Sequence, residues 1–119
     1  MTQEDKDLKQ LLLKDLCARL PYGVIIKTHD GNGHLNSIDQ TIFGVELGVN
    51  VSPVNRKNYS LEEVKPYLFP ISSITDRQYD IMYGITENDR HDWLNANHFD
   101  YRGLIEKGLA IDATGLNIY

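Results

Sequence analysis

One short segment alternates strictly between apolar residues and other residues, and it constrains the fold more than any other part of the sequence. Its apolar positions are Val45, Leu47, Val49 and Val51. A period of two is that of a β-strand with one face buried and the other in water. We therefore predict a strand whose four apolar side chains all point into a core, in an antiparallel sheet with one covered face.

The N-terminal region has a helical period instead. Leucines recur every fourth residue, at Leu8, Leu12, Leu16 and Leu20. This spacing predicts a helix from about Gln3 to Leu20 with one apolar face, which Leu11, Leu13 and Cys17 widen. Thr2 is a suitable N-cap, and Pro21 disfavours helical angles at the preceding residue and so ends the helix.

Turn residues divide the segments on either side of the alternating strand. Residues 23–29 and 35–39 are predicted strands, joined by a turn at Asp30-Gly31-Asn32-Gly33. Residues 60–63 form a capping box that can open only about one helical turn before Pro66. Residues 67–69 lie between two prolines, which predicts a short edge strand or an extended segment.

The last third of the sequence changes to a helical period. Residues 75–78 form a capping box for a helix in which Tyr79, Met82 and Tyr83 share one face, and we predict that this face belongs to the core. Residues 86–89 open a second helix. Asp100 is the predicted cap of a third helix, from Tyr101 to Lys107, and the tail 110–119 is apolar enough to dock on the rest.

Together these patterns predict an α+β fold in which residues 1–119 form a single domain. An N-terminal helix covers a small twisted antiparallel sheet, for which an SH3-like open barrel is one candidate form, and the C-terminal third is helical. The chain has 119 residues, close to the commonest size of a single domain.

Charge and composition narrow the range of functions. Residues 1–60 carry seven basic and seven acidic residues, whereas residues 61–119 carry five basic and ten acidic ones. An acidic surface disfavours nucleic-acid binding, which depends on lysine and arginine. No apolar run is long enough for a membrane span, and the polar N-terminus does not resemble an export segment. The single cysteine, Cys17, cannot form an internal disulfide, which favours the cytoplasm.

Three segments resemble a known family. They are LLLKDLCARLPYGV at 11–24, KPYLFP at 65–70, and DWLN with HFDYRGLI at 92–95 and 98–105. They resemble a small-protein family of unknown function from gut Bacteroides-type bacteria and their phage-like elements. The resemblance extends over nearly the whole chain to residue 117 and is least clear over residues 28–64. It implies an origin in a phage or mobile element but no catalytic or binding residue.

Two groups of histidine and aspartate could in principle bind a metal. Around the predicted hairpin turn lie His29, Asp30 and His34, although turn geometry alone explains asparagine, aspartate and glycine there. The second group comprises His91, Asp92, His98 and Asp100. It lacks the tight histidine pair of most zinc sites, and helix capping gives its members local roles. We predict no metal and no cofactor, with a small metal-dependent enzyme based on the second group as an alternative.

Other catalytic motifs are missing from the sequence. No serine lies in a Gly-x-Ser-x-Gly elbow, and the glycines at 31 and 33 are not placed as in a phosphate-binding loop. We predict no catalytic residue. Trp93, Tyr101 and Arg102 are of the types that anchor protein interfaces, and we predict that they bind a protein partner or a second copy of the chain.

The sequence therefore favours a non-enzymatic interaction or accessory protein. The alternatives are the metal-dependent enzyme and a small-barrel nucleic-acid-binding module, against which the acidic balance counts.

Overall fold

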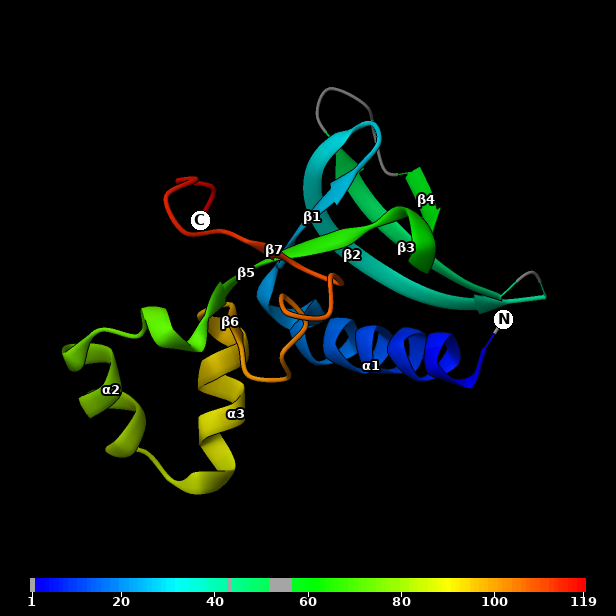
Figure 1. The fold of residues 1–119 in the computed structure, drawn as a ribbon. Coiled ribbons are helices and arrows are strands. Elements are labelled where there is room, and N and C mark those ends of the chain that lie inside the picture. The colour runs from blue at the N-terminus through cyan, green and yellow to red at the C-terminus, as the bar shows by residue number, and fades with distance from the viewer. Residues whose placement is uncertain (1, 43, 52–56) are drawn as a thin grey trace.

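The computed structural model describes residues 2–42, 44–51 and 57–119, which form an α+β fold (Figure 1). The α-helices are α1 (Gln3–Arg19), α2 (Asp76–Tyr83) and α3 (Glu87–Ala96). The strands are β1 (Ile25–Thr28), β2 (Gly31–Thr41), β3 (Gly44–Val51), β4 (Lys57–Ser60), β5 (Lys65–Pro70), β6 (Phe99–Asp100) and β7 (Ile111–Asp112). Short 3-10 turns are η1 (Leu20–Tyr22), η2 (Leu61–Glu63) and η3 (Ile71–Ser73).

The N-terminal helix confirms the leucine pattern but buries more than leucines. Thr2 and Asp5 form a reciprocal capping box at its start. Leu12 and Leu16 are buried, and so are the charged residues Asp15 and Arg19. Cys17 is exposed, so its predicted place on the apolar face was wrong. The buried face of α1 is therefore mixed, with leucines in its middle and an ion pair near its C-terminal end.

The first hairpin turns two residues earlier than predicted. Thr28 pairs with Gly31, so His29 and Asp30 alone form the loop. The Thr28 hydroxyl stabilises this loop, because it accepts a hydrogen bond from the Asp30 amide and donates one to the Gly31 carbonyl. Gly33 lies inside β2, where a Cβ would come within 2.0 Å of the Asn50 carbonyl oxygen. The glycine at 33 thus permits close strand contact.

The alternating segment is strand β3, and its register is confirmed. Leu47, Val49 and Val51 are buried in the core, and Val45 is partly buried against the same cluster. β3 pairs with β2 on one side and with β4 on the other, both antiparallel. The polar face carries Asn50, which is exposed.

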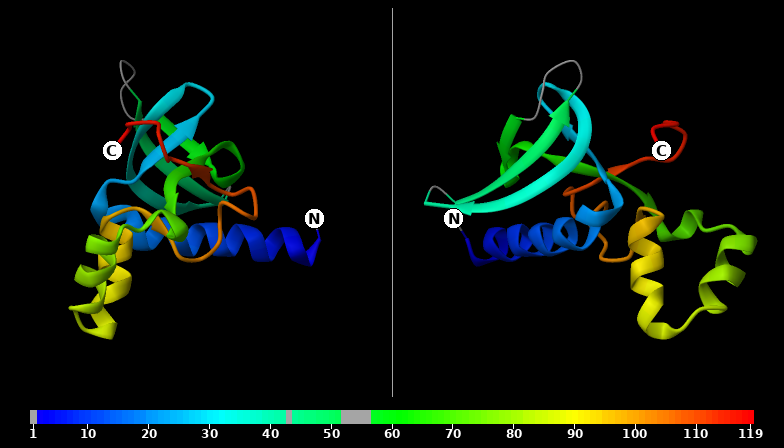
Figure 2. Two further views of the ribbon diagram at one scale, coloured as in Figure 1. Left: turned by 60° about the vertical axis from the view of Figure 1, so that its left-hand side comes forward. Right: turned by 180° about the vertical axis from the view of Figure 1, so that it is seen from behind.

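Strand β5 is not at an edge, as the flanking prolines suggested. It pairs with β1 antiparallel and with the short strands β6 and β7 in parallel. The sheet is therefore mixed rather than purely antiparallel. It is also open, so an SH3-like barrel stays a prediction. Figure 2 shows α1 along one side of the curved sheet, with α2 and α3 projecting beyond its end.

The C-terminal third contains two of the three predicted helices. Thr75 caps α2 through a reciprocal capping box with Gln78, and α3 follows Thr86. No third helix forms over residues 101–107, which make turns instead. The Asp100 carboxylate still accepts hydrogen bonds from the amides of Leu104 and Ile105. Gly103 has a φ of +76°, and this left-handed angle prevents a continuous helix.

The C-terminal tail is docked, as predicted. The Ala113 amide donates to the Leu68 carbonyl. The Tyr119 hydroxyl accepts a hydrogen bond from the Ile25 amide (2.8 Å) and donates one to the Tyr67 carbonyl (2.7 Å). One side chain therefore joins β1 to β5. None of the helices in the described ranges combines the length and apolar character that crossing a membrane takes.

Candidate functional site

The three residues predicted to bind a partner, Trp93, Tyr101 and Arg102, each contact other side chains of the same chain. Trp93, on α3, is partly buried, and its ring stacks on Phe99 at 5.7 Å. Tyr101 stacks on His91 at 4.9 Å. The Arg102 guanidinium lies 4.5 Å from the centre of the Tyr101 ring. Tyr101 and Arg102 thus share one surface, whereas Trp93 belongs to a different aromatic cluster.

Arg102 completes a buried ion cluster on α1. Asp15 and Arg19 are fully buried, and Arg19 Nε donates to Asp15 at 2.8 Å. Arg102 Nη1 donates to the other Asp15 oxygen at 2.8 Å. Arg19 Nη2 donates to the Phe99 carbonyl in β6. The cluster therefore ties the end of α1 to the chain around β6, which gives Arg102 a structural role.

Neither histidine group is brought together as a metal site, although in the first group His29 Nε2 lies 3.4 Å from an Asp30 carboxylate oxygen. Asp30 pairs with Lys57 and accepts a hydrogen bond from the Tyr59 hydroxyl, and these hydrogen bonds hold the pKa of Asp30 below its usual value. The His34 ring instead contacts the Gly23 carbonyl. Within the part of the chain that the structure describes, no three His, Cys, Asp or Glu side chains are grouped so that they could hold a metal ion.

The members of the second group have separate neighbours. The His91 ring lies on Tyr101, whereas the His98 ring lies on Tyr119 with their centres 3.7 Å apart. Asp100 is buried and binds the amides that follow it. His98 has a φ of +63°, a conformation that is strained for a residue other than glycine.

The burial of His98 makes stability depend on pH. Desolvation, and then the charges of Arg19 and His34, lower the pKa of His98 from 6.5 to about 4. Between these values the unfolded chain binds a proton that the folded chain does not, so stability is lost as pH falls from 6.5 towards 4. His98→Asn cannot titrate and tolerates a left-handed backbone. We expect its melting temperature to fall less than that of the parent between pH 7 and pH 5. Equal falls in thermal melts would contradict this.

A surface that the sequence assigned to the core is exposed. Helix α2 has no buried residue. Tyr79 and Tyr83 are 51% and 54% exposed, with ring centres 4.5 Å apart. The Arg90 guanidinium of α3 lies 4.6 Å above the Tyr83 ring. We call these three residues the Tyr–Arg surface. Their helical spacing correctly placed the tyrosines on one face, but α2 projects from the body and leaves both rings about half exposed.

The two helices that carry the Tyr–Arg surface have more acidic than basic side chains. Residues 75–96 carry five acidic and two basic residues. On α2 the exposed acids are Asp76 and Asp80, and on α3 they include Glu87 and Asp89. The surface therefore combines exposed aromatic rings and a guanidinium with a net negative charge on the two helices that carry it, which we call its acidic rim.

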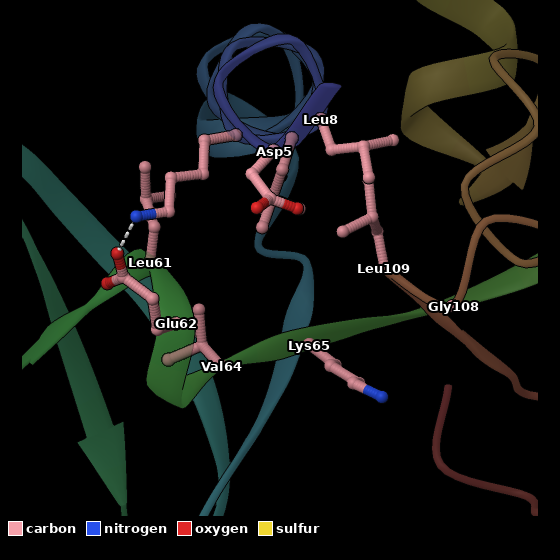
Figure 3. A pocket seen from close by; sticks show the side chains of 10 residues that line it. Asp5, Leu8, Leu61, Glu62, Val64, Lys65, Gly108 and Leu109 are labelled. Carbon is pink, nitrogen blue, oxygen red and sulfur yellow. Dashed lines mark ion pairs between the residues drawn. The ribbon is translucent and has the colours of Figure 1, made fainter. Parts of the chain in front are cut away.

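A groove of about 410 Å³ lies between α1 and the start of β5 (Figure 3). Its apolar lining comprises Leu8, Leu12, Leu61, Val64 and Leu109. Lys9 and Glu62 form an ion pair on one side, and Asp5 and Lys65 supply the other charges. The groove has two acidic and two basic side chains, so it has no net charge that would favour a ligand of one charge. The Tyr–Arg surface therefore offers the more specific chemistry.

Known proteins add nothing to this site, because no family model, curated protein or solved structure matches the chain. The resemblance to a family of Bacteroides-type bacteria and their phage-like elements stays a prediction.

Proposed function

We propose that the protein is a non-enzymatic interaction protein of the cytoplasm, and that its Tyr–Arg surface binds a basic protein partner. The observation that carries this proposal is the exposure of Tyr79 and Tyr83 on a helix without a buried residue. An isolated helix of eight residues is marginal in water, and most helical stability comes from packing of an apolar face. Tyrosine and arginine are also the residue types enriched at binding hot spots.

The charge of the rim favours a different protein over a second copy of this chain. A two-fold symmetric dimer through this surface would place the same patch on both sides. The acids of residues 75–96 would then face the acids of the other copy, and like charges across an interface cost several kcal/mol. A partner with apolar anchors and a lysine- or arginine-rich rim matches both features of the surface.

The two alternative functions have less support. The enzyme alternative used His91 and His98 together, and these rings stack on different tyrosines. A nucleic-acid-binding module needs a basic stripe, whereas the projecting helices are acidic.

The proposal predicts that the double variant Tyr79→Ser with Tyr83→Ser will bind the partner much more weakly without unfolding. Both side chains are about half exposed, so the melting temperature should stay within a few degrees of the parent. A photo-crosslinking amino acid at position 79 in the native host should yield a defined product with one basic protein. Binding of that protein, measured with the purified pair, should weaken at least a hundredfold in the double variant. Binding to the parent protein should also weaken as salt is added, because salt screens the charges at the surface.

Lys14, which is exposed on α1, provides the control position for the crosslinker. The same product from position 14, or binding that the double variant leaves unchanged, would overturn the proposal. An acidic partner whose binding does not respond to salt would overturn the assigned partner chemistry.

A further inference from the structure

A second pocket differs from the groove beside α1 because no acidic, lysine or arginine side chain lines it. Its volume is about 480 Å³, and it lies between the N-terminal end of α2, the C-terminal end of α3 and the tail. Its lining residues are phenylalanine, tyrosine, histidine, serine, threonine, asparagine, glutamine, alanine and glycine only. The size is within the range of small-molecule sites. We call it the neutral pocket.

The neutral pocket keeps its uncharged character over a wide pH range. Its two titratable side chains are His98 and Tyr119. Desolvation lowers the pKa of His98 to about 4, and at the hydrogen-bonded hydroxyl of Tyr119, a residue that is 42% exposed, it raises the pKa to about 12. A charged ligand would therefore find no counter-ion on this lining and would lose its hydration.

Aromatic rings form the apolar part of the lining, and they meet at steep angles. The Phe69 ring is tilted by 53° to Tyr119 and by 55° to Phe99. Flat ligands such as nucleobases are held best between parallel rings. In the two parallel ring pairs at this pocket, His98 with Tyr119 and Trp93 with Phe99, the rings are stacked on each other, so neither pair leaves a gap for a flat ligand between its rings. The remaining ring surfaces meet at an angle, which leaves room for a puckered ring rather than a flat one.

Polar side chains of the lining retain hydrogen-bonding capacity of both kinds. Gln78 uses its oxygen to accept from the Thr75 amide, which leaves its amino group without an acceptor in the described chain. Asn97 donates its amino group to the Trp93 carbonyl, which leaves its oxygen free of a donor there. The Ser73 hydroxyl donates to the Pro70 carbonyl and can still accept. A ligand hydroxyl, which both donates and accepts, matches such a mixture.

We propose that the neutral pocket binds an uncharged saccharide. The C–H face of the sugar ring packs against Phe69 and Tyr119, and its hydroxyls bond to Gln78 and Asn97. This chemistry follows from the lining alone and is independent of the partner that binds the Tyr–Arg surface. The strained backbone of His98 is consistent with a binding site here, since backbone strain of this kind is found most often at binding and catalytic sites.

Gln78→Glu is the variant that tests the proposal. Glutamate keeps the oxygen that completes the capping box with Thr75, so α2 should remain capped and the melting temperature should not fall. It also replaces the free amino group by a charged oxygen inside the neutral pocket. Gln10→Glu, the same change at an exposed position on α1, is the matched control.

The experiment titrates the purified protein with glucose, mannose, xylose, N-acetylglucosamine and their disaccharides, followed by amide chemical shifts in NMR spectra. Glucuronic acid and uridine are the charged and nucleoside comparisons. We expect at least one neutral sugar to shift the amides of Gln78, Asn97 and Tyr119, with binding at least tenfold weaker in Gln78→Glu and unchanged in Gln10→Glu. Binding of none of the neutral sugars, equal binding by Gln78→Glu, or preference for uridine or glucuronic acid would each overturn the proposal.

Discussion

Replacing Asp15 by alanine should destabilise the protein by about 3 to 5 kcal/mol, the usual cost of removing one partner from a buried ion pair. Asp15 and Arg19 have no exposed surface, and Asp15 accepts hydrogen bonds from both Arg19 and Arg102. Without the carboxylate, Arg19 keeps only the Phe99 carbonyl as a hydrogen-bond acceptor in the described chain. Urea denaturation of the parent and the variant measures the difference directly.

Two further variants separate the buried cluster from an ordinary ion pair. Glu62→Ala removes the partner of Lys9 at the surface and should cost less than about 1 kcal/mol. Asp15→Leu combined with Arg19→Met removes both buried charges and should recover part of the loss. A single Asp15→Ala variant as stable as Glu62→Ala would show that Arg19 finds water or another acceptor.

Val49→Asp should destabilise the fold by more than about 3 kcal/mol, because the carboxylate would be buried without a partner. Val49 has no exposed surface in the middle of β3. Its neighbour Asn50 points to the opposite face and is exposed, so Asn50→Asp should change stability by less than about 0.5 kcal/mol. Thermal melts of the two variants give the comparison, and similar losses from both would mean that the register of β3 is wrong.

Sequence periodicity predicted the helices and strands whose buried face follows from the spacing of their own apolar residues. The spacing of the leucines defined α1, and alternation defined β3, within a residue or so. The buried Asp15 and Arg19 could not be found this way, because helical spacing does not reveal which charged residues meet a partner far along the chain. The same holds for Gly33, whose need for glycine arises from the Asn50 backbone of the neighbouring strand.

The candidate site was harder to predict than the fold, because exposure depends on the position of a whole helix. Tyr79 and Tyr83 have the spacing of a core face, and only the projection of α2 leaves them in solvent. Arg102 is of a residue type that is common at interfaces, and only the position of α1 shows that its guanidinium pairs with Asp15. The capping box of Thr75 and Gln78 predicted where α2 starts, but no local pattern indicated what lies beside it.

The Tyr119 hydroxyl, which joins the Ile25 amide to the Tyr67 carbonyl, has a consequence for how the chain folds. Ile25 and Tyr119 are separated by 94 positions. The junction of β1 and β5 can therefore be completed only after nearly the whole chain has been brought together. Contacts between such distant residues require closure of a long loop and are associated with slow folding. The first hairpin can form early from local contacts, whereas the docking of Tyr119 across β1 and β5 is expected to be among the last events of folding.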